Sequence, residues 1–334
     1  MSNLDKVVLI TGITGFIATH TALAFLDAGY TVKGTARTAV KAEDWIARFP
    51  AHKARFHYAV IPDMVVAGAF DEAVKGCDIV AHVASPDNEA DFLIPAINGT
   101  KNLLLATKHE PRIQRVIYTS SLAAIFDSAL EAGKPVVETE WNSVTYDEAK
   151  VATEPLLVYR ASKALAERAF WDYIQDEKPA WAGSTICPCG TFAPPVQPLT
   201  SLSALNLSTA FVWDIANSKY KTGIPILDWP CYVDARDVAL AHVRAAERDA
   251  AKGQRYLLIG GTYVPGHFVE VMHRHFPDLR DNLPPIDLSK AGYRNFEYDA
   301  TKAIRELGIE YTTLEKMVVD TIAYIVDLQK QLSA

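Results

Sequence analysis

The chain has 334 residues, a formal net charge of −7 and a mean hydropathy of +0.04. A chain of this length is long for a single hydrophobic core, so we expect a large α/β domain or a main domain with a smaller lobe. The acidic balance argues against a nucleic-acid partner, because such partners select surfaces rich in Lys and Arg. Four cysteines are too few for a disulfide framework, and we expect them to be reduced.

Neither an export signal nor a membrane span is recognisable. Residues 1–6 contain no basic segment ahead of an apolar one. No later segment has roughly eighteen uninterrupted apolar residues, the minimum for a spanning helix. We therefore expect a cytoplasmic protein with no membrane partner.

The first elements in chain order predict a dinucleotide site. Residues 7–10 are a short β-branched run typical of a buried parallel strand, and a helical pattern begins after Gly15. Glycine lets the backbone approach a pyrophosphate, and the helix N-terminus favours its charge. Glycine also forms any tight βα turn, but its place after the first strand favours the binding site. The residues assigned to this site are Thr11, Gly12, Thr14, Gly15, Phe16 and Ile17.

The end of the second predicted strand, residues 31–35, indicates which cofactor binds. An acidic residue here accepts from the ribose 2′-hydroxyl of NAD, whereas an arginine suits the 2′-phosphate of NADP. Arg37 stands at this place with Lys41 nearby, so the sequence favours NADPH and NADP+. The alternative is a solvent-exposed arginine that starts the next helix.

The next two strands are predicted at residues 56–60 and 77–84, with a short helix between them. Ligands of open α/β sheets bind at the carboxyl ends of the strands. Asp63 and Met64 are therefore expected at the adenine end of the cofactor, and Ala84 and Ser85 beside it. In the helix that follows, Asn98 either holds a water molecule or satisfies a backbone group.

Two further segments carry candidate catalytic groups. Ser120 and Ser121 end a strand predicted at 115–119, where a serine either donates to a substrate carbonyl or caps a turn. A polar excursion over 126–154 precedes a helix at 156–174, on which Tyr159 and Lys163 lie one turn apart. The lysine favours the phenolate form of the tyrosine, which makes the phenol a candidate proton donor. Tyr-x-x-x-Lys is also common by chance on surface helices.

After a sixth strand at 181–186, the alternation of strands and helices lapses. We predict a Rossmann-like α/β fold, a doubly wound parallel sheet with a smaller C-terminal substrate-binding lobe. The cofactor domain would span residues 1–190 and take in about 232–260, and the lobe would lie mainly in 191–334. Helices are expected at 202–215, 301–307 and 314–328. No His or Cys spacing is that of a zinc site, so we expect no metal.

Four motifs together resemble the extended short-chain dehydrogenase/reductase superfamily. They are Thr11-Gly12-x-x-Gly15-x-x-Ala18, Ser120-Ser121, Tyr159-x-x-x-Lys163 and the sequence YVDARDVA at 232–239. Within it the chain is most similar to the dihydroflavonol-reductase-like branch, particularly the fungal NADPH-dependent aldehyde and carbonyl reductases. The sequences GTAR at 34–37 and ELGI at 306–309 also resemble that branch.

The resemblance implies an NADP-dependent oxidoreductase acting on CH–OH groups, which reduces a ketone or aldehyde. Tyr159 would donate the proton, Ser121 would polarise the carbonyl, and Lys163 would favour the phenolate and bind the nicotinamide ribose. Residues 188–194 are similar to the family's Pro-x-x-x-x-Gly-Pro loop beside the nicotinamide, although Ala193 replaces the glycine. Pro188 and Gly190 therefore join the cofactor residues.

The substrate is expected to be a small apolar or aromatic carbonyl compound. The candidate pocket residues, each of which could equally be core, are Ser85, Ile125, Phe126, Phe192, Phe211 and Trp229. One alternative is a nucleotide-sugar epimerase or dehydratase, against which Arg37 counts. Another is a nonenzymatic NADP-binding regulator, against which Tyr159 and Lys163 count. The choice between monomer and homodimer stays open.

Overall fold

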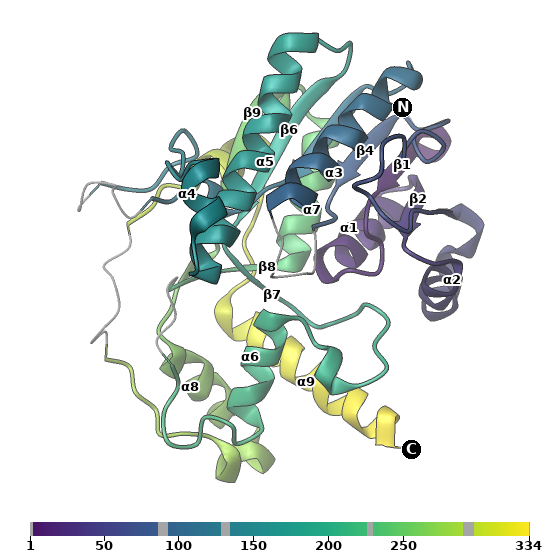
Figure 1. Ribbon diagram of the computed structural model, residues 1–334. Helices are drawn as coiled ribbons and strands as arrows, with labels where there is room; N and C mark the ends of the chain where they lie inside the picture. The colour runs from purple at the N-terminus through teal and green to yellow at the C-terminus, as the bar shows by residue number, and fades with distance from the viewer. Residues whose placement is uncertain (1–2, 86–92, 128–133, 226–229, 290–296, 334) are drawn as a thin grey trace.

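A seven-stranded parallel sheet forms the centre of the computed structural model, which describes residues 3–85, 93–127, 134–225, 230–289 and 297–333 (Figure 1). Its strand order is β3-β2-β1-β4-β5-β6-β9, and every pairing between neighbours is parallel. The strands are β1 Val7–Ile10, β2 Thr31–Ala36, β3 Phe56–Val60, β4 Ile79–His82, β5 Arg115–Thr119, β6 Ala182–Pro188 and β9 Gln254–Leu258. The order reverses between β1 and β4, and the carboxyl ends of strands at such a reversal are where open α/β sheets bind their ligands.

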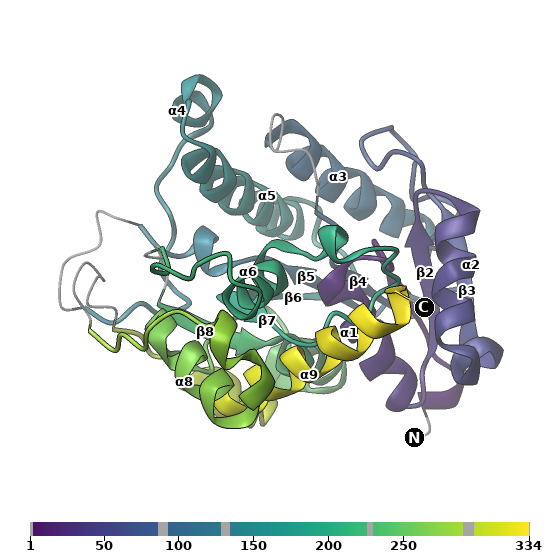
Figure 2. The ribbon, with the colours of Figure 1, turned by 90° about the horizontal axis from the view of Figure 1, so that it is seen from below.

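Helices cover both faces of this sheet (Figures 1 and 2), as the doubly wound prediction requires. They are α1 Phe16–Asp27, α2 Ala39–Arg48, α3 Leu93–Ala106, α5 Pro155–Glu177 and α7 Ala235–Glu247. Helix α1 packs beside α7, and α3 packs beside α5. One core contains Phe25, Trp45 and Val238, and the other contains Leu103 and Phe170. The predicted Rossmann-like fold is confirmed.

A second, largely helical unit carries its own core. It contains a three-stranded sheet in the order β10-β8-β7, in which β7 and β8 are parallel. Phe211, Phe268, Met317 and Ile322 are buried together in this unit. Its elements are β7 Gly190–Phe192, β8 Cys231–Asp234, β10 Gly261–Thr262, α6 Leu207–Ala216, α8 Pro265–His275 and α9 Leu314–Ser333.

The structure corrects three expectations about local elements. Residues 61–76 form turns instead of a short helix, and Gly68 and Gly76 have positive φ angles that interrupt a helix. The helix expected at 202–215 is a 3₁₀ turn, Leu202–Ala204, followed by α6, and that expected at 301–307 contains a π-helical turn, Ala303–Leu307. The predicted domain limits stay a prediction: β9 joins the large sheet, whereas β8 joins the small one.

Among the described residues, every helix is too short or too polar to span a lipid bilayer.

Candidate active site

The loop after β1 has a backbone geometry that favours glycine. Gly12 has a φ of 68°, and a Cβ atom on it would lie 3.1 Å from the Cβ of Ala84. Its N–H group donates to Thr35 Oγ1 at 3.0 Å. Gly15 is the N-cap of α1, and a Cβ there would lie 3.2 Å from the carbonyl oxygen of Gly12. The two glycines therefore permit close backbone packing where β1 meets α1.

Replacing Gly12 by alanine should lower the free energy of unfolding by about 1–3 kcal/mol more than replacing Gly76 by alanine, because only the first variant is overpacked. The two glycines have similar φ angles, 68° and 75°, but a Cβ on Gly76 would meet no described atom within 4 Å. Urea denaturation of both variants measures the difference. Equal losses would show that contact with Ala84 does not matter.

A buried contact between Thr11 and His82 joins the ends of β1 and β4. Thr11 Oγ1 accepts hydrogen bonds from the N–H groups of Val83 and Ala84 at 3.0 and 2.9 Å. The hydroxyl proton is then donated to His82 Nδ1, which lies 2.8 Å away. Burial, assisted by the charge of Lys163, lowers the pKa of His82 to about 3, so the imidazole is neutral and can accept. This contact fixes the segment that leads to Ser85.

The N-terminus of α1 offers backbone N–H groups to an anion. No side chain in the described residues caps this helix, whereas Thr38 caps α2 and Asp234 caps α7. Gly15 is exposed at the turn, which leaves the approach to these groups open. Uncapped N–H groups and the positive end of the helix dipole together suit a phosphate. The predicted residues in this turn are Thr14, Gly15, Phe16 and Ile17.

Arg37 and Lys41 lie beyond the carboxyl end of β2, and both are exposed. Thr38 stands between them and caps α2, where its Oγ1 accepts from the N–H group of Lys41 at 3.3 Å. This placement suits contact with a 2′-phosphate. Because it also suits an ordinary surface arginine, the role of Arg37 stays a prediction.

The turn after β3 packs against α3. Asp63 Oδ1 accepts from a backbone N–H group two residues later at 2.9 Å. A Cβ on Gly99 of α3 would overlap the Met64 side chain. Asn102 Nδ2 donates to the carbonyl oxygens of Met64 and Val65 at 3.0 and 2.8 Å. Asn102 therefore has the backbone role that the sequence offered as one choice for the nearby Asn98, which is half-buried on the same helix.

Tyr159 and Lys163 lie near the start of α5, and both are half-buried. Lys163 Nζ is 5.7 Å from the centre of the Tyr159 ring and donates to Ser85 Oγ at 2.9 Å. Ser85 follows β4, so the lysine connects α5 to the carboxyl end of that strand. The structure thus brings the predicted phenol and ammonium to the sheet edge where ligands of this fold bind.

Ser121 is placed beside the same helix. It follows β5 and caps the short 3₁₀ helix Leu122–Ala124, with its Oγ accepting from the N–H group of Ala123 at 3.1 Å. That 3₁₀ helix packs against α5. The neighbouring Ser120 is buried, and its hydroxyl donates to Glu167 at 2.6 Å. Because the Ser120 proton is used in the core, Ser121 is the better candidate for contact with a substrate.

The loop after β6 connects the two sheets. Pro188 ends β6, Gly190 begins β7, and a Cβ on Gly190 would lie 2.9 Å from the carbonyl oxygen of Cys231 on β8. Further along, His20 Nε2 of α1 lies 3.0 Å from the carbonyl oxygen of Pro194. Residues 188–194 therefore leave the main sheet, contribute β7 to the small sheet and then pass α1.

The YVDARDVA sequence fastens α7 to the C-terminal segment. Arg236 pairs with Asp234 at 2.6 Å and with Asp320 of α9 at 2.5 Å. Asp237 accepts from both the backbone N–H and the hydroxyl of Thr312, at 2.8 and 3.0 Å. These contacts give the motif a structural role.

The apolar pocket candidates are buried in two different cores. Ile125 and Phe126 belong to the core around α1 and α7, whereas Phe192 and Phe211 belong to the core of the small unit. Trp229 lies outside the described residues. Of the set, Ser85 is exposed and contacts Lys163. The pocket assignment therefore stays a prediction.

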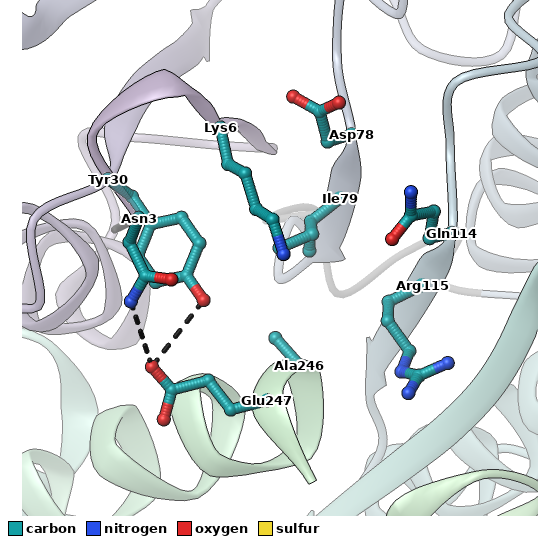
Figure 3. Close-up of a pocket in the computed structure, with 9 residues that line it drawn as sticks. All are labelled: Asn3, Lys6, Tyr30, Asp78, Ile79, Gln114, Arg115, Ala246 and Glu247. Atoms are coloured by element: carbon teal, nitrogen blue, oxygen red, sulfur yellow. Dashed lines mark hydrogen bonds between the residues drawn. The ribbon is translucent and has the colours of Figure 1, made fainter. Parts of the chain in front are cut away.

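A polar cavity of about 350 Å³ lies at the opposite edge of the sheet (Figure 3). Asn3 and Tyr30 both donate to Glu247 Oε1 there, at 3.2 and 3.4 Å. Ile79 and Arg115, at the amino ends of β4 and β5, line the same cavity. It is therefore separate from the candidate active site. Among the described residues, no group of three or more His, Cys, Asp or Glu side chains is arranged to hold a metal ion.

Comparison with known proteins identifies the family. Residues 8–260 match the model of the NAD dependent epimerase/dehydratase family. The chain belongs to this family.

Several family members that are similar to this chain are fungal reductases. A ketoreductase from Aspergillus niger is 38% identical, over 98% of this chain and 99% of its own. The crystal structure of Gre2 from Candida albicans in complex with NADPH has a TM-score of 0.87 and 34% identity, covering 96% of this chain and 99% of that one. Yeast methylglyoxal/isovaleraldehyde reductase Gre2, also complexed with NADPH, has a TM-score of 0.88 and 29% identity, covering 97% and 99%. The expected resemblance to fungal carbonyl reductases is confirmed.

Sequence reasoning missed one polar group of this family member, the buried ion pair of Glu167 and Arg255. Its bonds join Arg255 Nε and Nη2 to the two carboxylate oxygens, at 2.7 and 3.0 Å. The available signal was the spacing of Glu167, four residues after Lys163 on the same helix stripe. Its partner is 88 residues away in the sequence and has no local signature.

Proposed function

We propose that the chain reduces a ketone or aldehyde to an alcohol with NADPH as the cofactor. The observation that carries this proposal is the contact of Lys163 with Ser85, which joins the start of α5 to the carboxyl end of β4. The 3₁₀ helix that Ser121 caps packs against the same helix. The similarity to fungal reductases, two of them crystallised with NADPH, supports the same reaction.

The residues around β1 and β2 fit the cofactor. The uncapped N-terminus of α1 and the close approach that Gly12 permits would hold the pyrophosphate, while Arg37 and Lys41 would contact the 2′-phosphate. Lys163 would hold the nicotinamide ribose, and Asp63 and Met64 would lie toward the adenine. When bound, NADPH supplies the hydride.

The catalytic residues would donate the proton and stabilise the charge that develops on the carbonyl oxygen. Tyr159 Oη donates its proton to that oxygen as the alcohol forms. Ser121 Oγ donates a hydrogen bond to the same oxygen and orients it. Lys163 stabilises the phenolate that remains on Tyr159, through the electrostatic attraction of a neighbouring ammonium. Solvent then returns a proton to the phenolate.

We propose an apolar or aromatic substrate. Supporting this, one similar structure is that of a yeast methylglyoxal/isovaleraldehyde reductase, and isovaleraldehyde is a branched aldehyde with a hydrocarbon chain. A site for such a substrate needs mainly apolar side chains, unlike a site for a sugar diphosphate.

A panel assay tests the reaction class. The oxidation of NADPH is followed by absorbance with aromatic ketones, branched aldehydes and nucleotide sugars in parallel. We expect turnover with the carbonyl compounds and none with the nucleotide sugars. Epimerisation or dehydration of a nucleotide sugar without net oxidation of NADPH would contradict the proposal.

Replacing Arg37 by alanine should raise the KM for NADPH by about 10–100-fold, because a charge-assisted hydrogen bond contributes about 1.5–3 kcal/mol. The KM for NADH should change little, since NADH has no 2′-phosphate. Lys53→Ala provides a matched control, because Lys53 is exposed near the amino end of β3. Equal changes for the two cofactors would show that Arg37 does not read the phosphate.

A further inference from the structure

The buried carboxylate of Glu167 gathers contacts from several elements around the candidate active site. The side chain is fully buried and pairs with Arg255 of β9. It also accepts hydrogen bonds from Ser120 at the end of β5, at 2.6 Å, and from Thr185 of β6, at 2.7 Å. One carboxylate therefore joins helix α5 to three adjacent strands of the sheet.

Both partners of the bond between Ser120 and Glu167 lie near the catalytic candidates. Tyr159, Lys163 and Glu167 follow each other at intervals of four residues and so form one stripe along α5. Ser120 directly precedes Ser121. The bond between Ser120 and Glu167 therefore connects the helix that carries the phenol to the strand end that carries the serine.

Arg255 extends the same network to the polar excursion before α4 (Tyr146–Val151). Its Nη1 donates to the carbonyl oxygens of Glu138 and Glu140 at 2.6 and 2.8 Å. The guanidinium lies 3.7 Å from the centre of the Trp141 ring, and that of Arg168 lies 4.6 Å from it. The excursion is thus clamped to α5 beside the 3₁₀ helix that Ser121 caps, since the N–H group of Asn142 donates to the carbonyl oxygen of Ala124 at 2.9 Å.

We propose that Glu167 and Arg255, through Ser120, are positioning residues that set the distance between Ser121 and Tyr159. The buried ion pair is rigid because its carboxylate is held by several donors, and a fully satisfied network favours one arrangement. Loss of one donor at the strand end frees Ser121 to shift relative to the phenol. A misplacement of about 1 Å can slow a reaction by roughly 100-fold.

Ser120→Ala tests this role, with Ser184→Ala as a matched control. Both serines are buried, and both hydroxyls donate at 2.6 Å, Ser120 to Glu167 and Ser184 to the carbonyl oxygen of Ala251. The two variants remove the same group, but the Ser184 hydroxyl bonds a backbone carbonyl instead of Glu167. We expect kcat for carbonyl reduction to fall by about 10-fold or more in Ser120→Ala and to stay within about twofold in Ser184→Ala. The KM for NADPH should stay within about twofold in both.

A deuterium isotope effect separates misplacement from a general loss of folded protein. With NADPH deuterated at the transferred position, the isotope effect on kcat should rise in Ser120→Ala, because hydride transfer becomes more rate-limiting. Equal losses of kcat in the two serine variants, or an unchanged isotope effect, would overturn the proposal.

Trp141→Leu gives a second test if Ser120→Ala does not fold. This half-buried side chain lies in the polar excursion and packs against the guanidinium of Arg255. Its loss should lower kcat by about threefold without changing the KM for NADPH. An unchanged kcat would overturn the proposal. The inference rests on the proposed function, so a wild-type protein that reduces no carbonyl compound would refute both. An active wild type whose two serine variants lose kcat equally would refute only the positioning role.

Discussion

Replacing Tyr159 by phenylalanine should lower kcat for carbonyl reduction by about a thousandfold, because the variant lacks the general acid. The affinity for NADPH should stay nearly unchanged, since the ring and its packing are retained. Stopped-flow measurement of a single turnover, with NADPH binding followed by fluorescence, gives both quantities.

Tyr173→Phe is a control on the same helix. Residues 159 and 173 are separated by 14 positions of α5, which is about 21 Å along the helix axis. This variant should keep wild-type turnover. If Tyr159→Phe also turned over normally, the phenol would not be the proton donor.

Replacing Lys163 by methionine should impair both chemistry and cofactor binding. The ammonium group lies 5.7 Å from the Tyr159 ring centre and donates to Ser85 Oγ at 2.9 Å, and methionine offers neither the charge nor a donor. We expect kcat to fall by about 100-fold or more and the KM for NADPH to rise by about 10-fold. Steady-state kinetics at saturating carbonyl substrate separate the two effects.

Lys178→Met serves as the comparison, because Lys178 is exposed at the far end of the same helix. It should leave both constants unchanged. An unaltered KM for NADPH in Lys163→Met would show that Lys163 does not bind the nicotinamide ribose. An unaltered kcat would show that Lys163 does not assist Tyr159.

These two variants differ in what they should spare. Tyr159→Phe keeps the contact of Lys163 with the cofactor and removes only the phenolic proton. Lys163→Met removes an ammonium group that would act on both Tyr159 and the cofactor. The pair of results therefore distinguishes proton donation from cofactor positioning without any assumption about the substrate.

The parts of the fold that the sequence predicted are those with local signals. The β-branched run at β1, the glycine turn and the helix α1 follow each other within one short segment, and each is fixed by near neighbours. Tyr159 and Lys163 are likewise set by helix geometry alone. The resemblance to a known family added the order of these motifs along the chain.

The parts that the sequence did not predict depend on distant contacts. The partner of Glu167 is Arg255 on β9, and that of Arg236 is Asp320 on α9, 84 residues later. The sequence predicted a short helix between the third and fourth strands, but Gly68 and Gly76 have positive φ angles there and the segment forms turns. The pocket candidates Phe192 and Phe211 carry no periodic signal that separates a lining residue from a core residue.

In the proposed reaction, hydride passes from NADPH to the carbonyl carbon of the substrate. The most direct test is a single turnover with NADPH deuterated at the transferable position of the nicotinamide, followed by mass spectrometry and NMR of the product. We predict an alcohol with one deuterium on the former carbonyl carbon. A product without deuterium at that carbon, or no alcohol from any ketone or aldehyde, would contradict the proposed function.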